Sequence, residues 1–162
     1  MKTKDPIALQ PGSRAPDFSA LDQHGKLHTL HSLLATKRPL VLYFYPKDHT
    51  PGCTRQACAF RDLYSSFAAI PVTLCGISPD STASHARFAE KYQLPFTLLS
   101  DENKTIAQAY GTYVQKKLYG KVHMGIERTT FVISPDGSIR YIFRRVSPDS
   151  HPQEILETLR QA

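Results

Sequence analysis

One cysteine of this chain follows a short turn and lies where a thiol becomes reactive. The segment 46–53, PKDHTPGC, comes directly after the apolar run 39–44. That run predicts a buried β-strand, and helical periodicity begins near Thr54. We therefore expect Cys53 in the first turn of a helix, where unpaired backbone N–H groups and the helix dipole favour a thiolate over a thiol. Because the thiolate is the nucleophile, this position predicts a reactive cysteine.

The other two cysteines have different surroundings. Cys58 falls on the opposite face of the helix predicted over 54–68, and two helical Cα atoms five residues apart are separated by roughly 8–9 Å. A disulfide spans less than about 7 Å, so Cys53 and Cys58 could pair only if this part of the helix unwinds, as in a bond made during a catalytic cycle. The alternative for Cys58 is an incidental thiol on a polar helix face. Cys75 lies inside the predicted strand 72–77, where free cysteine behaves as a small apolar side chain.

Metal binding is an alternative function for these thiols. Cys53, Cys58, His49 and His85 are the candidate ligands, but their spacing is not Cys-x-x-Cys and the chain has no second pair. The histidines show no ligand spacing, so we expect them at the surface. His49, next to the reactive segment, is expected to be an ordinary loop residue. The sequence therefore predicts no metal centre.

Strands and helices alternate along the chain and must position Cys53. The segments 17–20 and 27–30 flank a turn and predict an N-terminal β-hairpin. Asp101 is expected to cap a helix that runs to about Tyr110. The segment 113–127, with its Gly, Lys and Tyr content, predicts a surface loop that borders the active site. The remaining strands are expected at 72–77, 96–99, 128–133 and 138–143, and the remaining helices at 54–68, 81–92 and 152–161.

This order of elements predicts an α/β fold with a central mixed β-sheet flanked by helices. We expect a single domain over residues 1–162, because 162 residues are enough to bury a core. The chain is 41% hydrophobic and 21% charged, as is typical of globular proteins. No apolar stretch approaches the length of a membrane span, and residues 1–6 show no signal peptide. The cytoplasm is therefore the expected compartment, and membrane association is not expected.

The net charge of +6 makes nucleic-acid binding a hypothesis to weigh. The basic residues are spread along the chain, however, and form local clusters only at 116–121 and 140–145. This distribution predicts a solvated basic face, suited at most to an acidic protein partner, and no binding of nucleic acid. An odd number of cysteines, three, does not suggest a structural disulfide framework in a reducing compartment.

The pattern P-x-x-x-T-x-x-C at 46–53 resembles the peroxiredoxin active-site signature. The longer run 43–54 is similar to the bacterioferritin comigratory protein, or peroxiredoxin Q, subfamily. The resemblance implies a thioredoxin-like fold and the reduction of hydrogen peroxide and organic hydroperoxides by cysteine alone, without metal, haem or flavin. It also implies a monomer. Further stretches that match in family order are 16–18, 76–80, 94–101 and 127–133.

The resemblance also implies a role for each matched residue. Cys53 would be the peroxidatic cysteine, which attacks a peroxide oxygen and becomes sulfenic acid. Thr50 would hydrogen-bond the peroxide, and Pro46 would shield the sulfur from water. Arg128 would keep the cysteine ionised and stabilise developing negative charge. Cys58 matches the resolving cysteine of members that carry both cysteines on one helix.

The implied product is an intrachain Cys53–Cys58 disulfide, which thioredoxin or a glutaredoxin-like dithiol protein would reduce. His49 departs from the family pattern, in which an acidic or amide residue is usual. Two other functions stay open. One is a thiol–disulfide oxidoreductase of the same fold, although Cys-x-x-Cys is missing. The other is a basic nucleic-acid-binding or chaperone-like module in which the cysteines act only as a redox switch.

Overall fold

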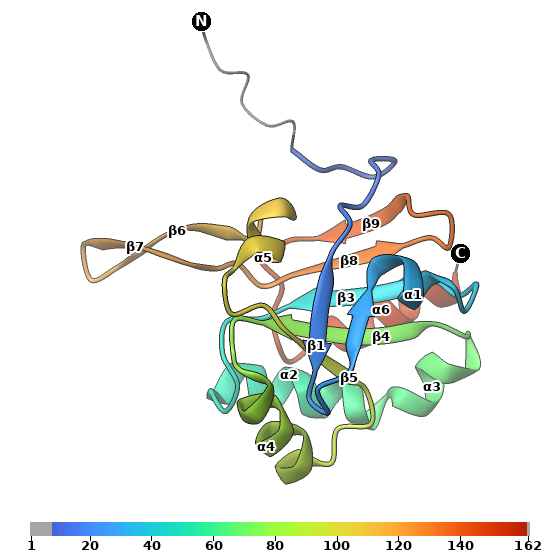
Figure 1. Ribbon diagram of the computed structural model, residues 1–162, viewed down its shortest axis with the longest axis horizontal. Coiled ribbons are helices and arrows are strands. Elements are labelled where there is room, and N and C mark those ends of the chain that lie inside the picture. The colour runs from blue at the N-terminus through green and yellow to red at the C-terminus, as the bar shows by residue number, and fades with distance from the viewer. Residues whose placement is uncertain (1–7, 162) are drawn as a thin grey trace, which may run out of the picture.

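The structure is a computed structural model that describes residues 8–161. A central β-sheet lies at the middle of the fold (Figure 1). The N-terminal segment 1–6, in which no signal peptide is expected, lies outside the described residues. In chain order the strands are Ser19–Asp22 (β1), Leu27–Thr29 (β2), Leu40–Phe44 (β3), Thr73–Ser78 (β4), Thr97–Ser100 (β5), Tyr113–Leu118 (β6), Lys121–Ile126 (β7), Thr129–Ile133 (β8) and Ile139–Phe143 (β9).

The seven-stranded sheet has the order β2-β1-β5-β4-β3-β8-β9. β3, β4 and β5 run parallel, while β1, β8 and β9 pair antiparallel with their neighbours, so the sheet is mixed as predicted. β1 and β2 form the N-terminal hairpin expected from the sequence. The helices of the described residues are Leu30–Leu34 (α1), Pro51–Asp62 (α2), Tyr64–Ala69 (α3), Thr82–Tyr92 (α4), Thr105–Ala109 (α5) and His151–Arg160 (α6).

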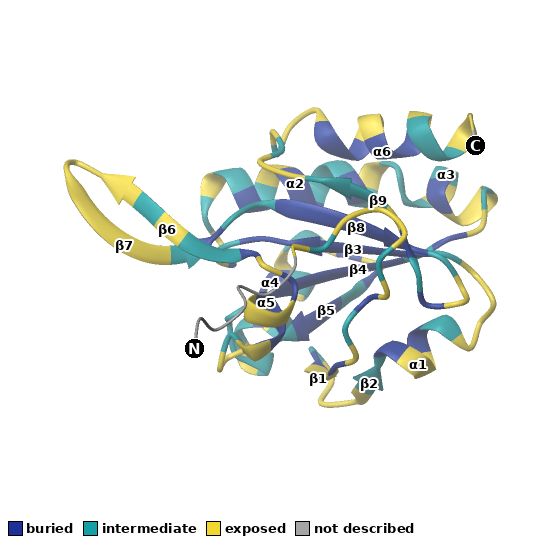
Figure 2. Cartoon of the chain, turned by 90° about the horizontal axis from the view of Figure 1, so that it is seen from above, coloured by how far each residue is buried: buried dark blue, intermediate teal, exposed yellow. Residues whose placement is uncertain are grey.

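Helices cover both faces of the sheet and bury two apolar clusters. One cluster joins the sheet to α1 and α5, and the other joins it to α2, α3, α4 and α6. Figure 2 shows α2 and α6 on one side of the strands and α1 on the other. None of the helices in residues 8–161 is long and apolar enough to cross a membrane.

β3 is the central strand that leads into the reactive segment. All five of its residues are buried, because it lies between β4 and β8 with helices over both faces. Alternate side chains reach opposite clusters, since successive residues of a strand point to opposite faces. The antiparallel register pairs Phe44 with Thr129. The end of β3 and the start of β8 therefore lie side by side, which brings Arg128 to the segment that carries Cys53.

The helix predicted over 54–68 is two helices. α2 begins at Pro51, a favourable first helical residue because its missing N–H has no intrahelical partner to lose. It ends at Asp62, and α3 begins after Leu63, whose φ and ψ of −98° and 4° are not those of a regular α-helix. The apolar period hides this break, because Phe60 before it and Phe67 after it are both fully buried in the same cluster.

The prediction of a surface loop over 113–127 is wrong. β6 and β7 form an antiparallel hairpin that extends away from the sheet (Figures 1 and 2). Tyr119 and Gly120, both with positive φ, make the tight turn between the strands. Most of the hairpin is exposed on both faces, so its sequence lacks the apolar alternation by which a half-buried strand is recognised.

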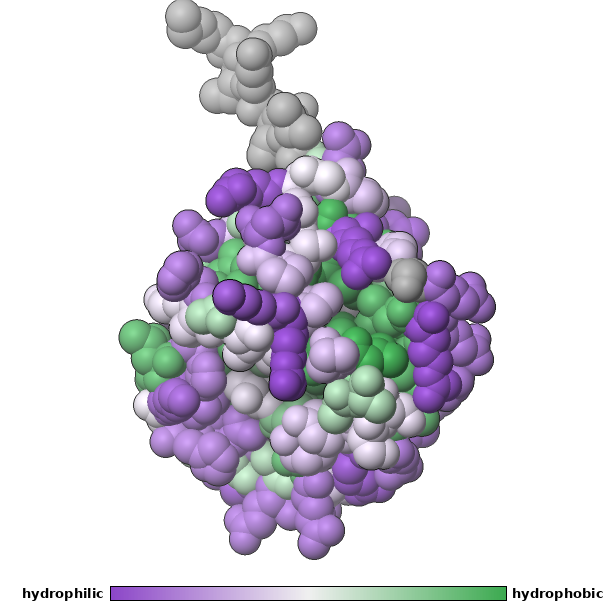
Figure 3. All heavy atoms as spheres, turned by 90° about the vertical axis from the view of Figure 1, so that its right-hand side faces the viewer, coloured by the Kyte–Doolittle hydropathy of each residue, from purple (hydrophilic) through white to green (hydrophobic). Residues whose placement is uncertain are grey.

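The end of the molecule opposite the hairpin is mainly hydrophilic, with apolar patches between polar side chains (Figure 3).

The helix expected after Asp101 begins later than predicted. α5 starts at Thr105 and has Lys104 in the N-cap position. The Asp101 carboxylate still accepts hydrogen bonds from the backbone N–H groups of Ile106 and Ala107, at 3.1 and 2.9 Å. It satisfies two amides of the first turn from four residues upstream, which is the function predicted for it.

Candidate active site

Cys53 lies in the first turn of α2, as the strand-to-helix pattern predicts. Thr50 is the N-cap residue, with extended backbone, and Cys53 is the third residue of the helix. The thiol is almost fully buried, with 2% of the residue exposed, and it packs into the cluster beneath α2. The first turn of a helix presents unpaired backbone N–H groups and the positive end of the helix dipole at this position.

Arg128 contacts the Cys53 sulfur directly. The Arg128 Nη2 atom donates to Cys53 Sγ at 3.3 Å across 75 positions of sequence. The guanidinium group also lies against Gly52, where a Cβ atom would be in van der Waals contact with Arg128 Nη2 at 3.4 Å.

Gln56 is a site residue that the sequence analysis missed. It is fully buried on α2, one turn after Cys53, and its Oε1 atom accepts a hydrogen bond from Arg128 Nη1. The guanidinium group is thus held by two partners on one helix, which fixes its second nitrogen against the sulfur. The i, i+3 spacing between Cys53 and Gln56 was the available signal, because residues at that spacing share a helix face.

Thr50 and Pro46 lie in the segment between β3 and α2 and are both partly exposed. The Thr50 hydroxyl donates to the Lys47 backbone carbonyl at 2.8 Å and makes no side-chain cap to the helix. Its oxygen keeps lone pairs that can accept a hydrogen bond. Pro46 lines a hollow of about 390 Å³, which is also lined by the part of the β6–β7 hairpin nearest the sheet.

Lys116 on β6 adds a second cation near the thiol. Its stem passes over Gly125 on the paired strand, where a Cβ atom would lie only 3.2 Å from Lys116 Cδ. Burial and the charge of Arg128 lower the pKa of Lys116, whereas Glu127 and Cys53 act in the opposite direction. The segment 113–126 thus borders the site, as predicted, although it does so as a hairpin.

Cys58 and Cys75 have surroundings different from those of Cys53. Cys58 is partly exposed on α2, and all three cysteines are free thiols. α2 is continuous from Pro51 to Asp62, so the helix that separates Cys53 from Cys58 is intact. Cys75 is fully buried in β4, as predicted, and burial, assisted by the charge of Asp22, raises the pKa of its thiol to about 12.

Two histidines contradict the prediction of a surface position. His85 and His151 are both fully buried. His151 Nε2 lies 2.9 Å from Thr130 Oγ1, and burial with the nearby charge of Arg128 lowers the pKa of His151 to about 4. His49 is exposed, as expected, and has a left-handed backbone with φ of 65°. Sequence periodicity missed both buried rings because a histidine is polar by type yet can be satisfied by one or two hydrogen bonds.

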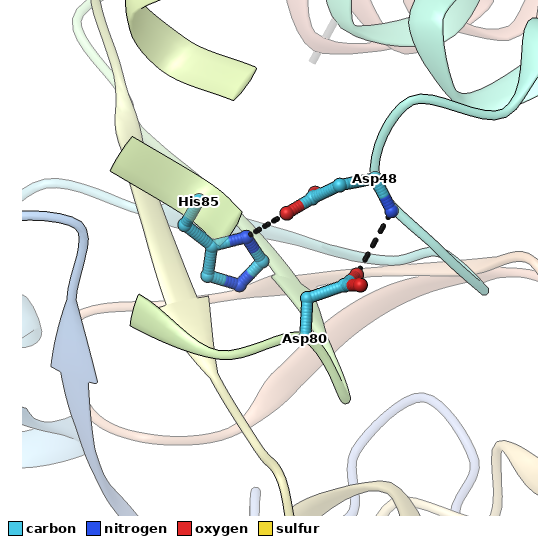
Figure 4. Close-up of side chains that lie close together, drawn as sticks. All are labelled: Asp48, Asp80 and His85. Carbon is cyan, nitrogen blue, oxygen red and sulfur yellow. Dashed lines mark hydrogen bonds and ion pairs between the residues drawn. The ribbon is translucent and has the colours of Figure 1, made fainter. Parts of the chain in front are cut away.

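His85 lies in a group of side chains whose types can bind a metal ion, and this group differs from the set of candidate ligands taken from the sequence. Asp48, Asp80 and His85 present ligand-type atoms within 4.8 Å of one another (Figure 4). These atoms already hydrogen-bond to one another and to neighbouring groups. Neither Cys53 nor Cys58 takes part in this group, so the thiols and the histidines proposed as joint ligands do not meet there.

A mixed sheet between helices, with a buried thiol in the first turn of a helix and an arginine against the sulfur, defines a cysteine-based oxidoreductase site. The family model for AhpC/TSA proteins matches residues 11–142, and the chain belongs to this family. It is a peroxiredoxin, as its relatives are.

Peroxiredoxin Bcp of Bacillus subtilis is 42% identical over 154 residues, which cover 95% of this chain and 97% of that protein. The structure of Xanthomonas campestris peroxiredoxin Q matches with a TM-score of 0.86 and 34% identity, over 94% of this chain and 96% of its own. The bacterioferritin comigratory protein of the same organism matches with a TM-score of 0.85 and 32% identity, over 97% and 98%. These matches confirm the thioredoxin-like fold and the subfamily that the sequence resembles.

Proposed function

We propose that this peroxiredoxin reduces hydrogen peroxide and organic hydroperoxides with Cys53 as its peroxidatic residue. The contact of Arg128 Nη2 with Cys53 Sγ, at 3.3 Å in the first turn of α2, is the observation that carries the proposal. A fixed cation and a helix N-terminus both stabilise the thiolate. They also provide preorganised donors where negative charge moves from the sulfur to the peroxide oxygens.

The Cys53 thiolate attacks the terminal oxygen of the hydroperoxide, and the O–O bond breaks. The leaving oxygen takes a proton and departs as water or an alcohol, and Cys53 becomes a sulfenic acid. Thr50 is proposed to hydrogen-bond the peroxide, because it is the N-cap residue of the helix that carries Cys53 and is partly exposed. Pro46 is proposed to limit access of water. The X. campestris bacterioferritin comigratory protein is described for its alkyl peroxide reduction activity, which supports the organic substrates.

Cys58 is proposed to resolve the sulfenic acid. The first turns of α2 unwind, the Cys58 sulfur attacks the Cys53 sulfur, and water leaves as the disulfide forms. A dithiol protein, thioredoxin or glutaredoxin-like, then attacks the disulfide and returns both thiols. The partial exposure of Cys58, against the burial of Cys53, supports this sequence because the incoming sulfur lies on the accessible side of the helix. We propose that the enzyme acts as a monomer in the cytoplasm.

Cys58→Ser tests the resolving step. We expect the first oxidation by one equivalent of peroxide to keep its wild-type rate, while steady-state turnover with thioredoxin and its reductase falls on the order of a hundredfold or more, since the disulfide cannot form. Stopped-flow and NADPH-coupled assays measure the two quantities. Cys75→Ser is the matched control and is expected to keep both. Normal steady-state turnover in Cys58→Ser would overturn the assignment.

A further inference from the structure

The segment between β3 and α2 has a buried side chain as well as its exposed ones. Asp48 lies between Pro46 and Thr50, yet it is only 3% exposed and points toward α4 (Figure 4). Its carboxylate accepts hydrogen bonds from Tyr45 Oη at 2.6 Å and from Ser84 Oγ at 2.9 Å. The Nδ1 atom of His85, a fully buried residue of α4, lies 2.7 Å from Asp48 Oδ2.

Both ring nitrogens of His85 have an oxygen atom within hydrogen-bond distance. Nε2 lies 2.9 Å from the backbone carbonyl of Leu99, which can only accept, so Nε2 donates. Burial alone would raise the pKa of Asp48, but the hydrogen bonds and charge of His85, with those of Tyr45 and Ser84, hold it below its usual value. Asp48 Oδ2 and His85 Nδ1 thus form a buried carboxylate–histidine hydrogen bond, which joins the reactive segment to α4.

Two further contacts fix the same bend. The Asp48 backbone N–H donates to Asp80 Oδ2 at 2.8 Å, and Ser78 Oγ donates to the same oxygen at 2.5 Å. His49, the next residue, has a φ of 65°, a conformation that an L-residue other than glycine rarely adopts without contacts that hold it. Its ring meets Phe88 edge-to-face at 5.1 Å, one turn along α4 from His85.

We propose that the buried Asp48–His85 pair is a positioning device for the peroxide reaction. It holds the left-handed bend that turns the chain from β3 into α2, and it thereby sets where Pro46 and Thr50 stand relative to the Cys53 sulfur. Arg128 reaches the sulfur from the residue before β8, outside this bend. The pair therefore affects the reaction with peroxide more than the general nucleophilicity of the thiol. The inference rests on the proposed function of Cys53.

The chain offers a matched control for this pair. Asp22 and His28 form a second carboxylate–histidine pair with the same 2.7 Å separation, in the N-terminal hairpin on β1 and β2. Asp22 is 5% exposed, so both pairs bury their carboxylate. His85→Asn and His28→Asn each remove the imidazole ring from a carboxylate–histidine pair, and only one of the two pairs contacts the reactive segment.

The experiment compares two second-order rate constants of reduced protein: oxidation of Cys53 by hydrogen peroxide and its alkylation by iodoacetamide. Alkylation needs the thiolate but no peroxide geometry. We expect His85→Asn to slow peroxide oxidation by about tenfold to a hundredfold, the scale of a displacement near 1 Å, and to change alkylation by less than about threefold. His28→Asn is expected to keep both rates.

Equal peroxide rates in wild type and His85→Asn, or equal losses in both reactions, would overturn the inference. Ser84→Ala provides a second test if His85→Asn does not fold, because it removes another hydrogen bond that holds the Asp48 carboxylate in place. We expect it to slow the peroxide reaction alone by up to about fivefold, and unchanged rates would again overturn the inference. Slow oxidation of the wild type would instead contradict the proposed function itself.

Discussion

Cys53 and Cys75 are two buried thiols on opposite faces of one sheet, and only one of them has a cation against its sulfur. Their residues are 2% and 0% exposed. Cys75 is surrounded by the apolar cluster under α1 and α5, and burial raises the pKa of its thiol to about 12. Cys53 meets Arg128 Nη2 at 3.3 Å in the first turn of α2. Burial by itself makes a thiol unreactive, whereas burial beside a fixed cation at a helix N-terminus builds a site.

Removal of the cation should have the largest effect on this contrast. In Arg128→Met, Cys53 keeps its burial and its helix terminus but loses its charged donor. We expect the rate constant for oxidation by peroxide to fall on the order of a hundredfold, the usual cost of a lost donor at developing negative charge. Stopped-flow mixing of reduced protein with hydrogen peroxide measures it.

Arg145→Met controls for net charge in that comparison. Arg145 lines the same hollow as Arg128, but its side chain is 84% exposed and pairs with Glu127 at 3.3 Å. We expect its oxidation rate to stay within about twofold of wild type, because exposed charges are screened by solvent and salt. Similar losses in the two variants would mean that the general basic field, and not the contact with Cys53, activates the thiol.

A smaller effect on the oxidation rate is expected when Arg128 is kept but loses one of its hydrogen-bond partners. Gln56→Met keeps the length of the side chain and removes the acceptor of Arg128 Nη1. We expect oxidation about tenfold slower at neutral pH, because one charged hydrogen bond of this kind contributes roughly 1.5–3 kcal/mol. A wild-type rate in Gln56→Met would show that the hydrogen bond to Gln56 is not needed to position Arg128.

Cys75 should affect stability at alkaline pH and leave the peroxide rate unchanged. Its folded-state pKa, about 12, lies above the ordinary thiol value of 9.0. The stabilisation that follows from this difference is fully present below about pH 9 and is lost as pH rises toward 12. Urea unfolding at pH 8 to 10.5 should therefore show a steeper loss in wild type than in Cys75→Val, by up to about 1 kcal/mol per pH unit. Parallel curves would contradict the buried, neutral thiol.

The two halves of the site differ in how far the sequence predicts them. The reactive cysteine follows from local order: an apolar strand, a turn and a helix start place Cys53 in a first turn by sequence alone. Arg128 lies 75 positions away, and only the family resemblance identifies it as more than a charge at a strand end. Gln56 was missed because its partner could not be known until β8 was placed beside β3.

The wrong predictions share a physical cause. Periodicity reports one buried face, so it missed the β6–β7 hairpin, which is exposed on both faces. The apolar periodicity also continues past Leu63, because α2 and α3 bury side chains in the same cluster, so it did not predict the break between the two helices. His85 and His151 are buried although they are polar by type, because a partner distant in sequence lies within hydrogen-bond distance of Nε2 in each ring, and residue type alone carries no sign of those partners.

The central claim is that Cys53, and not Cys75 or Cys58, is the thiol activated for peroxide. The most direct test mixes reduced protein with one equivalent of hydrogen peroxide in a stopped-flow instrument and maps the products by intact mass and peptide analysis. We predict oxidation several orders of magnitude faster than that of a free cysteine, ending in a species two hydrogens lighter with Cys53 joined to Cys58. Oxidation at the rate of an ordinary thiol, or a first product on another cysteine, would contradict the account.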